Sequence, residues 1–389
     1  LAGLAFAERS TTEQLSAMLL TAGRRGLNVP LELVLRVVGR EGSSAIVDFV
    51  RHFDIFRWTE EANGNQFLGV RTRLEAELLA RENLTDLTEV DVVVSYIRHV
   101  RPLFNGRTGG DEIQFIVDLM NQIGPQSIEQ GRYARWYGDL ADAFAEQREH
   151  SGMLHPRLVL QEVNLTREYV KSTQRSNDLT QEERLARLRA SEDLLQRTLE
   201  EGDTSPRARL NLYLELAASL GSQAYELVTE EGHSSTEAIR PILERLVDAV
   251  MRARAADPEN IYPVDVLAWA AKDAVSSGGM TPQARVSLLA EAKASLDSID
   301  PQDLSPGHLA KYRARQADIS RLLGDKDLET SYLQELMRID DPAAYYLLAV
   351  RALGDTRDPE SVKIALRVLL DAPTSIRDDW KCARLILDL

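Results

Sequence analysis

The stretch that decides the fold runs from Ser43 to Arg81 and reads SSAIVDFVRHFDIFRWTEEANGNQFLGVRTRLEAELLAR. Apolar residues at helical spacing predict a helix over 45–53. Aromatic and β-branched residues then predict strands over 55–59 and 66–70. The dipeptide Asn63-Gly64 between them favours a hairpin, because a type I′ turn needs positive φ at both central residues. The sequence therefore predicts a helix followed by a β-hairpin.

The residues around this stretch extend the pattern in both directions. Helical stripes predict helices over 11–22 and 31–38 before it, and a helix over 71–81 after it. Helix, helix, helix and a two-stranded wing is the order of a winged helix, which we assign to a domain over residues 1–82. Many winged helices bind DNA, but that requires a basic third helix and wing. Here acidic side chains balance the arginines of both, so a structural or docking role is favoured.

Composition limits the partners that can be expected. The chain has 389 residues, a net charge of −15 and a single cysteine, Cys382, which excludes a disulfide framework and suits the cytoplasm. No apolar run reaches the ~20 residues that a membrane-spanning helix needs. Residues 1–81 hold ten arginines and ten acidic residues, so the acidity belongs to the rest of the chain. Neither nucleic acid nor a membrane is expected as a partner, whereas a protein ligand with basic patches is.

A region over 83–128 separates the predicted winged helix from the remainder. It begins with a polar link, continues with a helix over 90–104, and contains the stretch Asn105–Gly110, NGRTGG. Because two of these residue types favour turns and flexible backbone, we predict a hinge within 83–110.

Residues 129–389 read as a train of amphipathic helices. The later helices are predicted in pairs: 264–275 with 282–299, 309–323 with 328–339, and 343–353 with 360–370, followed by a last helix from 379. Asp-Pro steps punctuate them, where Asp can cap a helix and Pro fits its first turn. Repeated helix pairs of this length are typical of a solenoid. The predicted fold class is therefore mostly α: a winged helix with a small β-hairpin, followed by an α-solenoid.

The helical half resembles degenerate tetratricopeptide repeats. Ala253–Asn260, ARAADPEN, matches the Ala…Asp-Pro-x-Asn ending of that family, and 344–373 has its aromatic, small and Pro placement. The family's Trp-x-x-Leu-Gly-x-x-Tyr opening is missing from every pair, so HEAT-like repeats stay open as an alternative.

A winged helix followed by such repeats resembles the C-terminal half of a STAND NTPase, the class that includes NLR immune sensors and the bacterial antiviral STAND (Avs) proteins. The resemblance implies a sensor that binds a protein ligand, such as a phage protein, and a homo-oligomer on activation. No Gly-x-x-x-x-Gly-Lys-Ser/Thr occurs in the sequence. We therefore expect the ATPase, with its ATP or ADP and Mg²⁺, and the effector to lie ahead of Leu1, and no cofactor in this chain.

The resemblance also implies a nucleotide contact. In the family, a His just after the wing strand contacts the β-phosphate of the bound nucleotide, and Arg71 stands at that place here. The simpler interpretation is that Arg71 pairs with Glu75 one helical turn on. His52, beside Asp54, is a second candidate, either as a switch residue or as a polar residue at a domain edge.

Candidate ligand-binding residues mix cations with aromatics, the composition of protein-binding surfaces. They are Arg132, Tyr133, Arg135, Trp136 and Tyr345. The three aromatic residues also fit buried helical stripes, so core packing is favoured for them, whereas the two arginines are expected to be exposed.

No catalytic constellation and no metal-ligand spacing is visible, so the chain itself is not expected to be an enzyme. Two other functions remain open: a transcription regulator with a DNA-reading winged helix, and a repeat scaffold without a switch.

Overall fold

The computed structural model describes residue 6 and residues 8–39, 42–60, 64–102, 107–176, 178–202, 204–228, 236–257, 260–276, 280–339, 341–354 and 358–389. The described chain is mostly helical with one small antiparallel sheet, as predicted. It divides into two compact units, Leu1–Ser219 and Leu220–Leu389. Each unit is described by itself.

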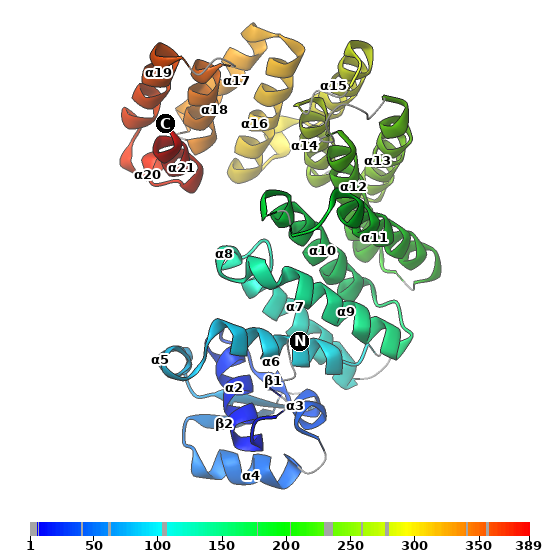
Figure 1. Ribbon diagram of the computed structural model, residues 1–389, viewed down its shortest axis with the longest axis vertical. Coiled ribbons are helices and arrows are strands. Elements are labelled where there is room, and N and C mark those ends of the chain that lie inside the picture. The colour runs from blue at the N-terminus through cyan, green and yellow to red at the C-terminus, as the bar shows by residue number, and fades with distance from the viewer. Residues whose placement is uncertain are drawn as a thin grey trace. The chain divides into compact units, whose positions relative to one another are not determined.

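In the described residues, the first unit begins with five helices and three short strands (Figure 1). The elements up to residue 100 are α2 (Thr11–Gly23), β1 (Val29–Pro30), α3 (Leu31–Val38), α4 (Gly42–His52), β2 (Phe56–Glu60), β3 (Gln66–Val70), α5 (Arg73–Asn83) and α6 (Asp86–His99). Helix α2 lies at their centre and contacts α3, α4, α5, α6 and β3. Ser10 and Glu13 start this helix with a capping box.

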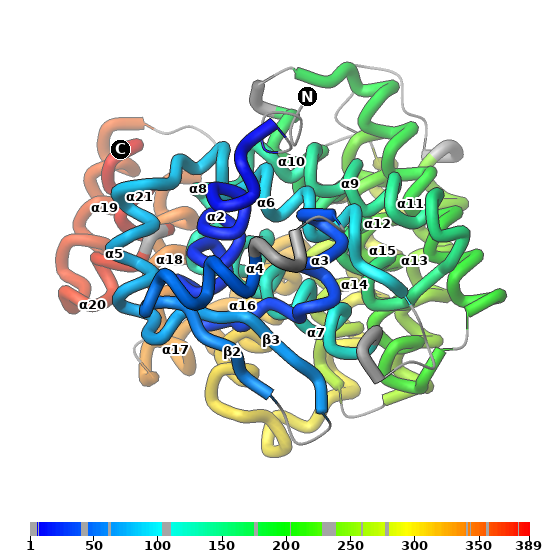
Figure 2. The backbone as a smooth tube through the Cα atoms, turned by 90° about the horizontal axis from the view of Figure 1, so that it is seen from below, coloured from blue at the N-terminus to red at the C-terminus, as the bar shows by residue number. Residues whose placement is uncertain are grey.

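The sheet has three strands, in the order β1-β3-β2, and both pairings are antiparallel. Strands β2 and β3 form the predicted hairpin, with Phe56 opposite Val70 and Glu60 opposite Gln66. Figure 2 shows them running side by side. Asn63 of the predicted turn lies outside the described residues, and Gly64 has the expected positive φ of 82°.

The prediction of only two strands is wrong. Val29 pairs with Leu68, and Pro30, predicted to begin a helix, pairs with Phe67 before α3 starts at Leu31. A two-residue strand ending in Pro carries no alternating pattern. Pro is tolerated both at a strand edge and at a helix start, so Pro30 by itself does not indicate a strand.

The rest of the first unit is helical. It contains α7 (Arg107–Ile123), α8 (Gln130–Tyr133), the 3-10 helix η1 (Ala134–Trp136), α9 (Tyr137–Ser151), α10 (Pro156–Ser176), α11 (Gln181–Glu201) and α12 (Pro206–Val228), which crosses the division between the units.

One hydrophobic core runs through this unit from Phe6 to Leu165, and helix α6 contributes six buried apolar residues to it. The part of the predicted hinge segment that α6 occupies is packed into this core, and a hinge within 83–110 stays a prediction. Residues 103–106 lie outside the described residues, and 107–110 form the first turn of α7 instead of a loop. The apolar stripe of α7 packs into the same core, which outweighs the weak helix preference of Gly109 and Gly110.

The second unit is a series of helices in which each from α13 to α18 packs on the next. Its elements are α13 (Thr236–Ala256), α14 (Tyr262–Ser276), α15 (Pro282–Asp297), η2 (Pro301–Asp303), α16 (Pro306–Leu323), α17 (Lys326–Arg338), α18 (Pro342–Leu353), α19 (Pro359–Leu370), α20 (Thr374–Arg377) and α21 (Trp380–Asp388). The predicted helices of this part are confirmed to within about three residues at nearly every end. Asp358 accepts hydrogen bonds from the backbone N–H groups of Glu360 and Ser361, as its Asp-Pro step predicts. Pro258 of another such step lies outside the described residues.

Candidate functional site

The largest group of buried charges in the described chain surrounds Glu89, a residue in the first turn of α6. We call it the Glu89 cluster. It joins the end of α2, helix α5, the start of α6 and helix α8, and its members are Arg24, Arg25, Glu77, Asp86, Glu89, Glu129, Arg132 and Tyr133.

Local sequence explains how these side chains meet. Helix α2 ends at Gly23, so Arg24 and Arg25 directly follow a buried stretch and lie together at its C-terminus. Thr85 caps α6, which places Asp86 and Glu89 in the first turn. There the helix dipole favours negative charge, just as the C-terminal end of α2 favours positive charge. Two helix ends of opposite polarity therefore face each other across the cluster.

Arg24 bridges two carboxylates on different helices. Its Nε and Nη2 donate to the two oxygens of Glu77, at 2.9 and 3.0 Å, in a bidentate pair, and its Nη1 pairs with Glu89. Arg24 is 7% exposed and Glu89 is 1% exposed, so water cannot replace these bonds. Buried charge is tolerated only when it is paired and hydrogen-bonded, and this geometry meets that condition.

Arg25 holds the other oxygen of the same carboxylate. Its Nη2 donates to Glu89 Oε2 at 2.8 Å, and its Nη1 donates to the backbone oxygen of Thr21 at 2.6 Å. Tyr133, 1% exposed, donates its hydroxyl to Glu89 Oε2 at 2.5 Å and also pairs with Arg25. Arg132 adds an outer layer, because its Nε donates to Asp86 at 2.7 Å and its Nη2 to Glu89 at 3.3 Å.

The electrostatics follow from burial and from these partners. Burial by itself raises the pKa of the Glu89 carboxyl, but Arg25, the Tyr133 hydroxyl and Arg24 outweigh it and hold that pKa below its usual value. Burial raises the pKa of the Tyr133 hydroxyl, which stays protonated and able to donate. Glu89 is therefore a fixed anion at neutral pH.

The cluster leaves no charge to offer a ligand. Three guanidinium groups face the carboxylates of Glu77, Asp86, Glu89 and Glu129, and every one of these groups has an opposite charge within 4.0 Å. An active site normally keeps a reactive group unpaired or with its pKa near the working pH. The ion pairs therefore have a structural role: they join the four helices α2, α5, α6 and α8.

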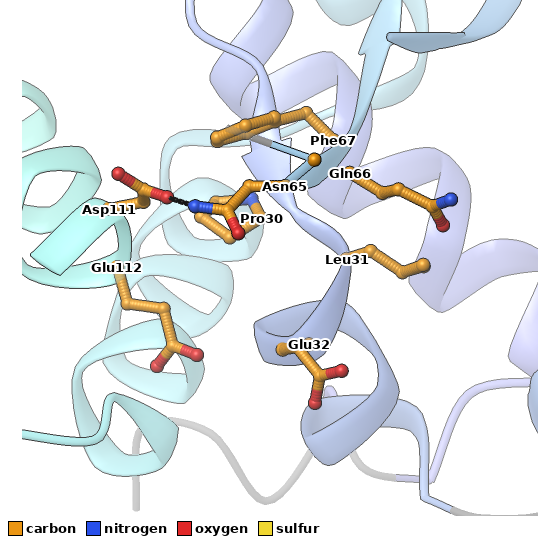
Figure 3. A pocket seen from close by; sticks show the side chains of 9 residues that line it. Pro30, Leu31, Glu32, Asn65, Gln66, Phe67, Asp111 and Glu112 are labelled. Carbon is orange, nitrogen blue, oxygen red and sulfur yellow. Dashed lines mark hydrogen bonds between the residues drawn. The ribbon is translucent and has the colours of Figure 1, made fainter. Parts of the chain in front are cut away.

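A small cleft lies where strands β1 and β3 meet helix α7 (Figure 3). It measures about 160 Å³ and is lined by Pro30, Leu31, Glu32, Gly64, Asn65, Gln66, Phe67, Asp111 and Glu112. The Asn65 side chain donates to Asp111, and buried Glu112 pairs with Arg36 and accepts from the backbone N–H of Arg101 at 3.0 Å. Because ligand pockets usually measure about 300–1,000 Å³, this cleft is too small for a nucleotide.

The two predicted nucleotide contacts lie near each end of the hairpin: His52 ends α4, which precedes β2, and Arg71 directly follows β3. Arg71 is 57% exposed and pairs with Glu75 at 2.5 Å, and its backbone N–H donates to Ile55 at 2.8 Å. This is the pairing that the simpler interpretation of Arg71 predicted, and a phosphate contact stays a prediction. His52 is exposed, and its Nδ1 lies 2.7 Å from the backbone oxygen of Asp48.

The predicted ligand-binding residues divide between core and surface. Tyr133 is buried in the Glu89 cluster, and Arg132 is held there by Asp86, so neither is free to meet a partner in this conformation. Arg135 is exposed and lies 3.8 Å above the half-buried ring of Trp136. Tyr345 is half-buried against the cores of the last helices. The structure brings Arg132 and Tyr133 together with Glu89, and places Arg71 and His52 at a different joint.

The sequence pointed to Arg132 and Tyr133 but not to Arg24, Arg25 or Glu89. One signal was available: two consecutive arginines directly after an apolar helix, and a glutamate followed by a run of valines. In the described residues, no group of three or more His, Cys, Asp or Glu could hold a metal ion, and no helix is both long and apolar enough to cross a membrane.

Comparison with known proteins gives no relative. No family model, no curated protein and no solved structure matches the chain.

Proposed function

We propose that this chain is the sensing and autoregulatory half of a STAND-type NTPase of the bacterial antiviral kind. The order of elements in the first unit carries the proposal. Helix, strand, helix, helix, strand, strand, with the sheet order β1-β3-β2, is the arrangement of a winged helix. The third strand, which the sequence did not predict, makes that agreement closer than the hairpin alone would.

The second unit supports the sensing role. Consecutive helices pack against each other from α13 to α19, and α14 also packs against α16, the next helix but one. Such an order suits stacked helix pairs, in which one face of alternate helices is left for a partner. Tetratricopeptide-like or HEAT-like pairs both agree with it. The ligand proposed is a protein with basic patches, because the chain beyond residue 81 carries all of the net negative charge.

The proposed switch leaves the ion pairs of the Glu89 cluster intact. Because α6 shares one core with α2 and α9, residues 11–165 would move as one piece when a ligand binds the repeats. A ligand can shift a two-state equilibrium only by its differential affinity, and a few kcal/mol suffice for a strong shift. The shift would release an ATPase domain ahead of Leu1 and allow oligomerisation in the cytoplasm.

The proposal is tested on the full-length polypeptide. A P-loop ahead of Leu1, and ATP hydrolysis that rises with a lysate of phage-infected cells and not with an uninfected lysate, would support it. A full-length sequence without a P-loop would contradict it. Hydrolysis that no lysate stimulates would favour a scaffold.

Charge argues against the transcription regulator. From α4 to the end of β2 the described residues hold two arginines, Arg51 and Arg57, against Asp48, Asp54 and Glu60. DNA binding by this face would need an excess of cations. Fluorescence anisotropy with a labelled duplex at low salt is expected to show no binding at micromolar protein, and sequence-selective nanomolar binding would overturn this ranking.

A further inference from the structure

The outer edge of strand β2 has no paired strand among the described residues. In the order β1-β3-β2 the strand pairs with β3 on one side only, and among the described elements its main contacts are β3 and α4. An open edge presents a row of backbone donors and acceptors to any strand that can pair with it.

The register shows which backbone groups point outward. The N–H of Arg71 donates to the oxygen of Ile55 at 2.8 Å, so Ile55 and Arg71 form a hydrogen-bonded pair. In an antiparallel ladder such pairs alternate, so Arg57 and Thr59 bond to β3, whereas the backbone groups of Phe56, Trp58 and Glu60 face away from it.

Four of these outward groups suit a partner strand. The N–H of Phe56 is already used, because it donates to the oxygen of Phe53 at 3.1 Å. The oxygen of Phe56, both backbone groups of Trp58 and the N–H of Glu60 have no hydrogen bond within the described part of the chain. They are arranged symmetrically about Trp58.

The edge has little of the usual protection. Natural edge strands are blunted by Pro, a bulge or charged side chains, especially Lys; Phe56–Glu60 has no Pro, Lys or bulge, and its only charged side chains are Arg57 and Glu60. Trp58 is 40% exposed and Phe53 is 43% exposed. Phe53 lies 6.3 Å from Phe56, ring centre to ring centre, and Phe56 and Trp58 share a face of the strand. Apolar side chains therefore flank the open backbone groups.

We propose that β2 pairs antiparallel with β2 of a second copy of this chain, with the two-fold axis at Trp58. In that register Trp58 exchanges both of its backbone hydrogen bonds with Trp58 of the second copy. Each Glu60 N–H donates to the opposite Phe56 oxygen. Every free outward group named above finds a partner, and the N–H that Phe53 already occupies is not needed.

The side chains and the charge of this region are compatible with a second copy of the chain as the partner. The two Trp58 rings lie opposite each other and Arg57 lies opposite Thr59, so no like charges are directly paired. The net charge of residues 1–81 is zero, while the chain carries −15. Two copies can therefore meet at this face without the repulsion that their acidic parts would cause. The inference does not depend on the proposed function.

Association of the 389-residue chain tests the proposal. The contact is small, so we expect a dissociation constant in the micromolar range and a dimer at about 200 μM in sedimentation equilibrium. Trp58→Pro removes the outward N–H together with the indole ring but no hydrogen bond to β3, because Trp58 does not bond to β3, and it should weaken association at least tenfold. Trp58→Tyr keeps the N–H and an aromatic ring and should stay within about threefold. Equal melting temperatures would show that both variants fold.

Cross-linking tests the register. In a Cys382→Ala background, Trp58→Cys places two thiols on a hydrogen-bonded pair with Cα atoms ~5.5 Å apart, which a disulfide can span. Arg57→Cys places them on a diagonal of about 8 Å, which it cannot. Fast dimer formation only for Trp58→Cys is expected. A monomer at about 200 μM, an association unchanged by Trp58→Pro, or equal cross-linking of the two cysteine variants would overturn the proposal.

Discussion

Arg25 donates a hydrogen bond to Glu89 across 64 residues of sequence, from the end of α2 to the start of α6, at 2.8 Å. This bond joins the predicted winged helix to the segment that the sequence presented as a linker. Arg24 binds the other oxygen of the same carboxylate, and Tyr133 of α8 closes the group. The first unit is therefore held together by charge as well as by its apolar core.

Removing the charge of Glu89 should destabilise the first unit. Glu89→Gln leaves Arg24, Arg25 and Arg132 without their shared anion, and breaking a buried pair costs about 3 kcal/mol. Hydrogen exchange by mass spectrometry is expected to show faster exchange in peptides of α2 and α6 and unchanged exchange in α16 and α17. Glu77→Gln, at a site 25% exposed, is the matched control and should cost about 1 kcal/mol. Equal losses of stability in the two variants would contradict this structural role of the Glu89 cluster.

Acid should weaken the fold through His155. Burial and the nearby Arg157 lower the pKa of His155 from 6.5 to about 4. Between these values the unfolded chain binds a proton that the folded chain does not, so stability is complete above pH 6.5 and falls as the pH drops towards 4. His155→Gln should remove this component. Urea midpoints at pH 7.5 and 5.0 test it: the midpoint of the wild type should fall by more than that of the variant, and equal falls would refute the assignment.

Gly23 should not tolerate a side chain. A Cβ at this position would lie 2.6 Å from Val70 Cγ2 and 3.2 Å from the Cβ of Ala76, both buried. Gly23→Ala is expected to cost about 1–3 kcal/mol through overpacking between α2 and β3. Gly131 lies in helix α8 with open space around it, so Gly131→Ala should be neutral or stabilising by about 0.5–1 kcal/mol. Thermal unfolding of the two variants gives the comparison, and a Gly23→Ala protein as stable as wild type would show that this packing is loose.

Arg71 can be tested against its structural role. Arg71→Gln and Glu75→Gln break the same exposed ion pair. If the pair is purely structural, the two variants should change the rate of ADP release equally. A phosphate contact predicts that only Arg71→Gln speeds release of bound ADP from the full-length protein, whereas Glu75→Gln leaves release unchanged or slows it. Stopped-flow release of a fluorescent ADP separates the two.

The sequence predicted the helices of the second unit well because each is bounded by local signals. Thr281, Ser305 and Asp358 cap helices that begin with Pro, and these signals act within four residues. The hairpin was equally local. Strand β1 could not be predicted because only its pairing with β3 makes Val29 and Pro30 a strand.

The pairing of the charges in the Glu89 cluster could not be predicted from the sequence for the same reason. Its partners come from the end of α2, from α5, from the start of α6 and from α8, and nothing near Arg24 in the sequence indicates Glu89. Core packing was correctly favoured for Tyr133, since its helical stripe is a local property. Arg132, expected to be exposed, has a side chain that is 30% exposed, because an acidic residue from elsewhere in the chain binds it.

One measurement tests the sensor proposal most directly. ATP hydrolysis and particle mass of the full-length protein are followed together, with lysates of infected and uninfected cells. The account predicts that only the infected lysate raises both the hydrolysis rate and the mass. A rate and a mass that stay the same with both lysates, in a protein shown to bind ATP, would contradict it.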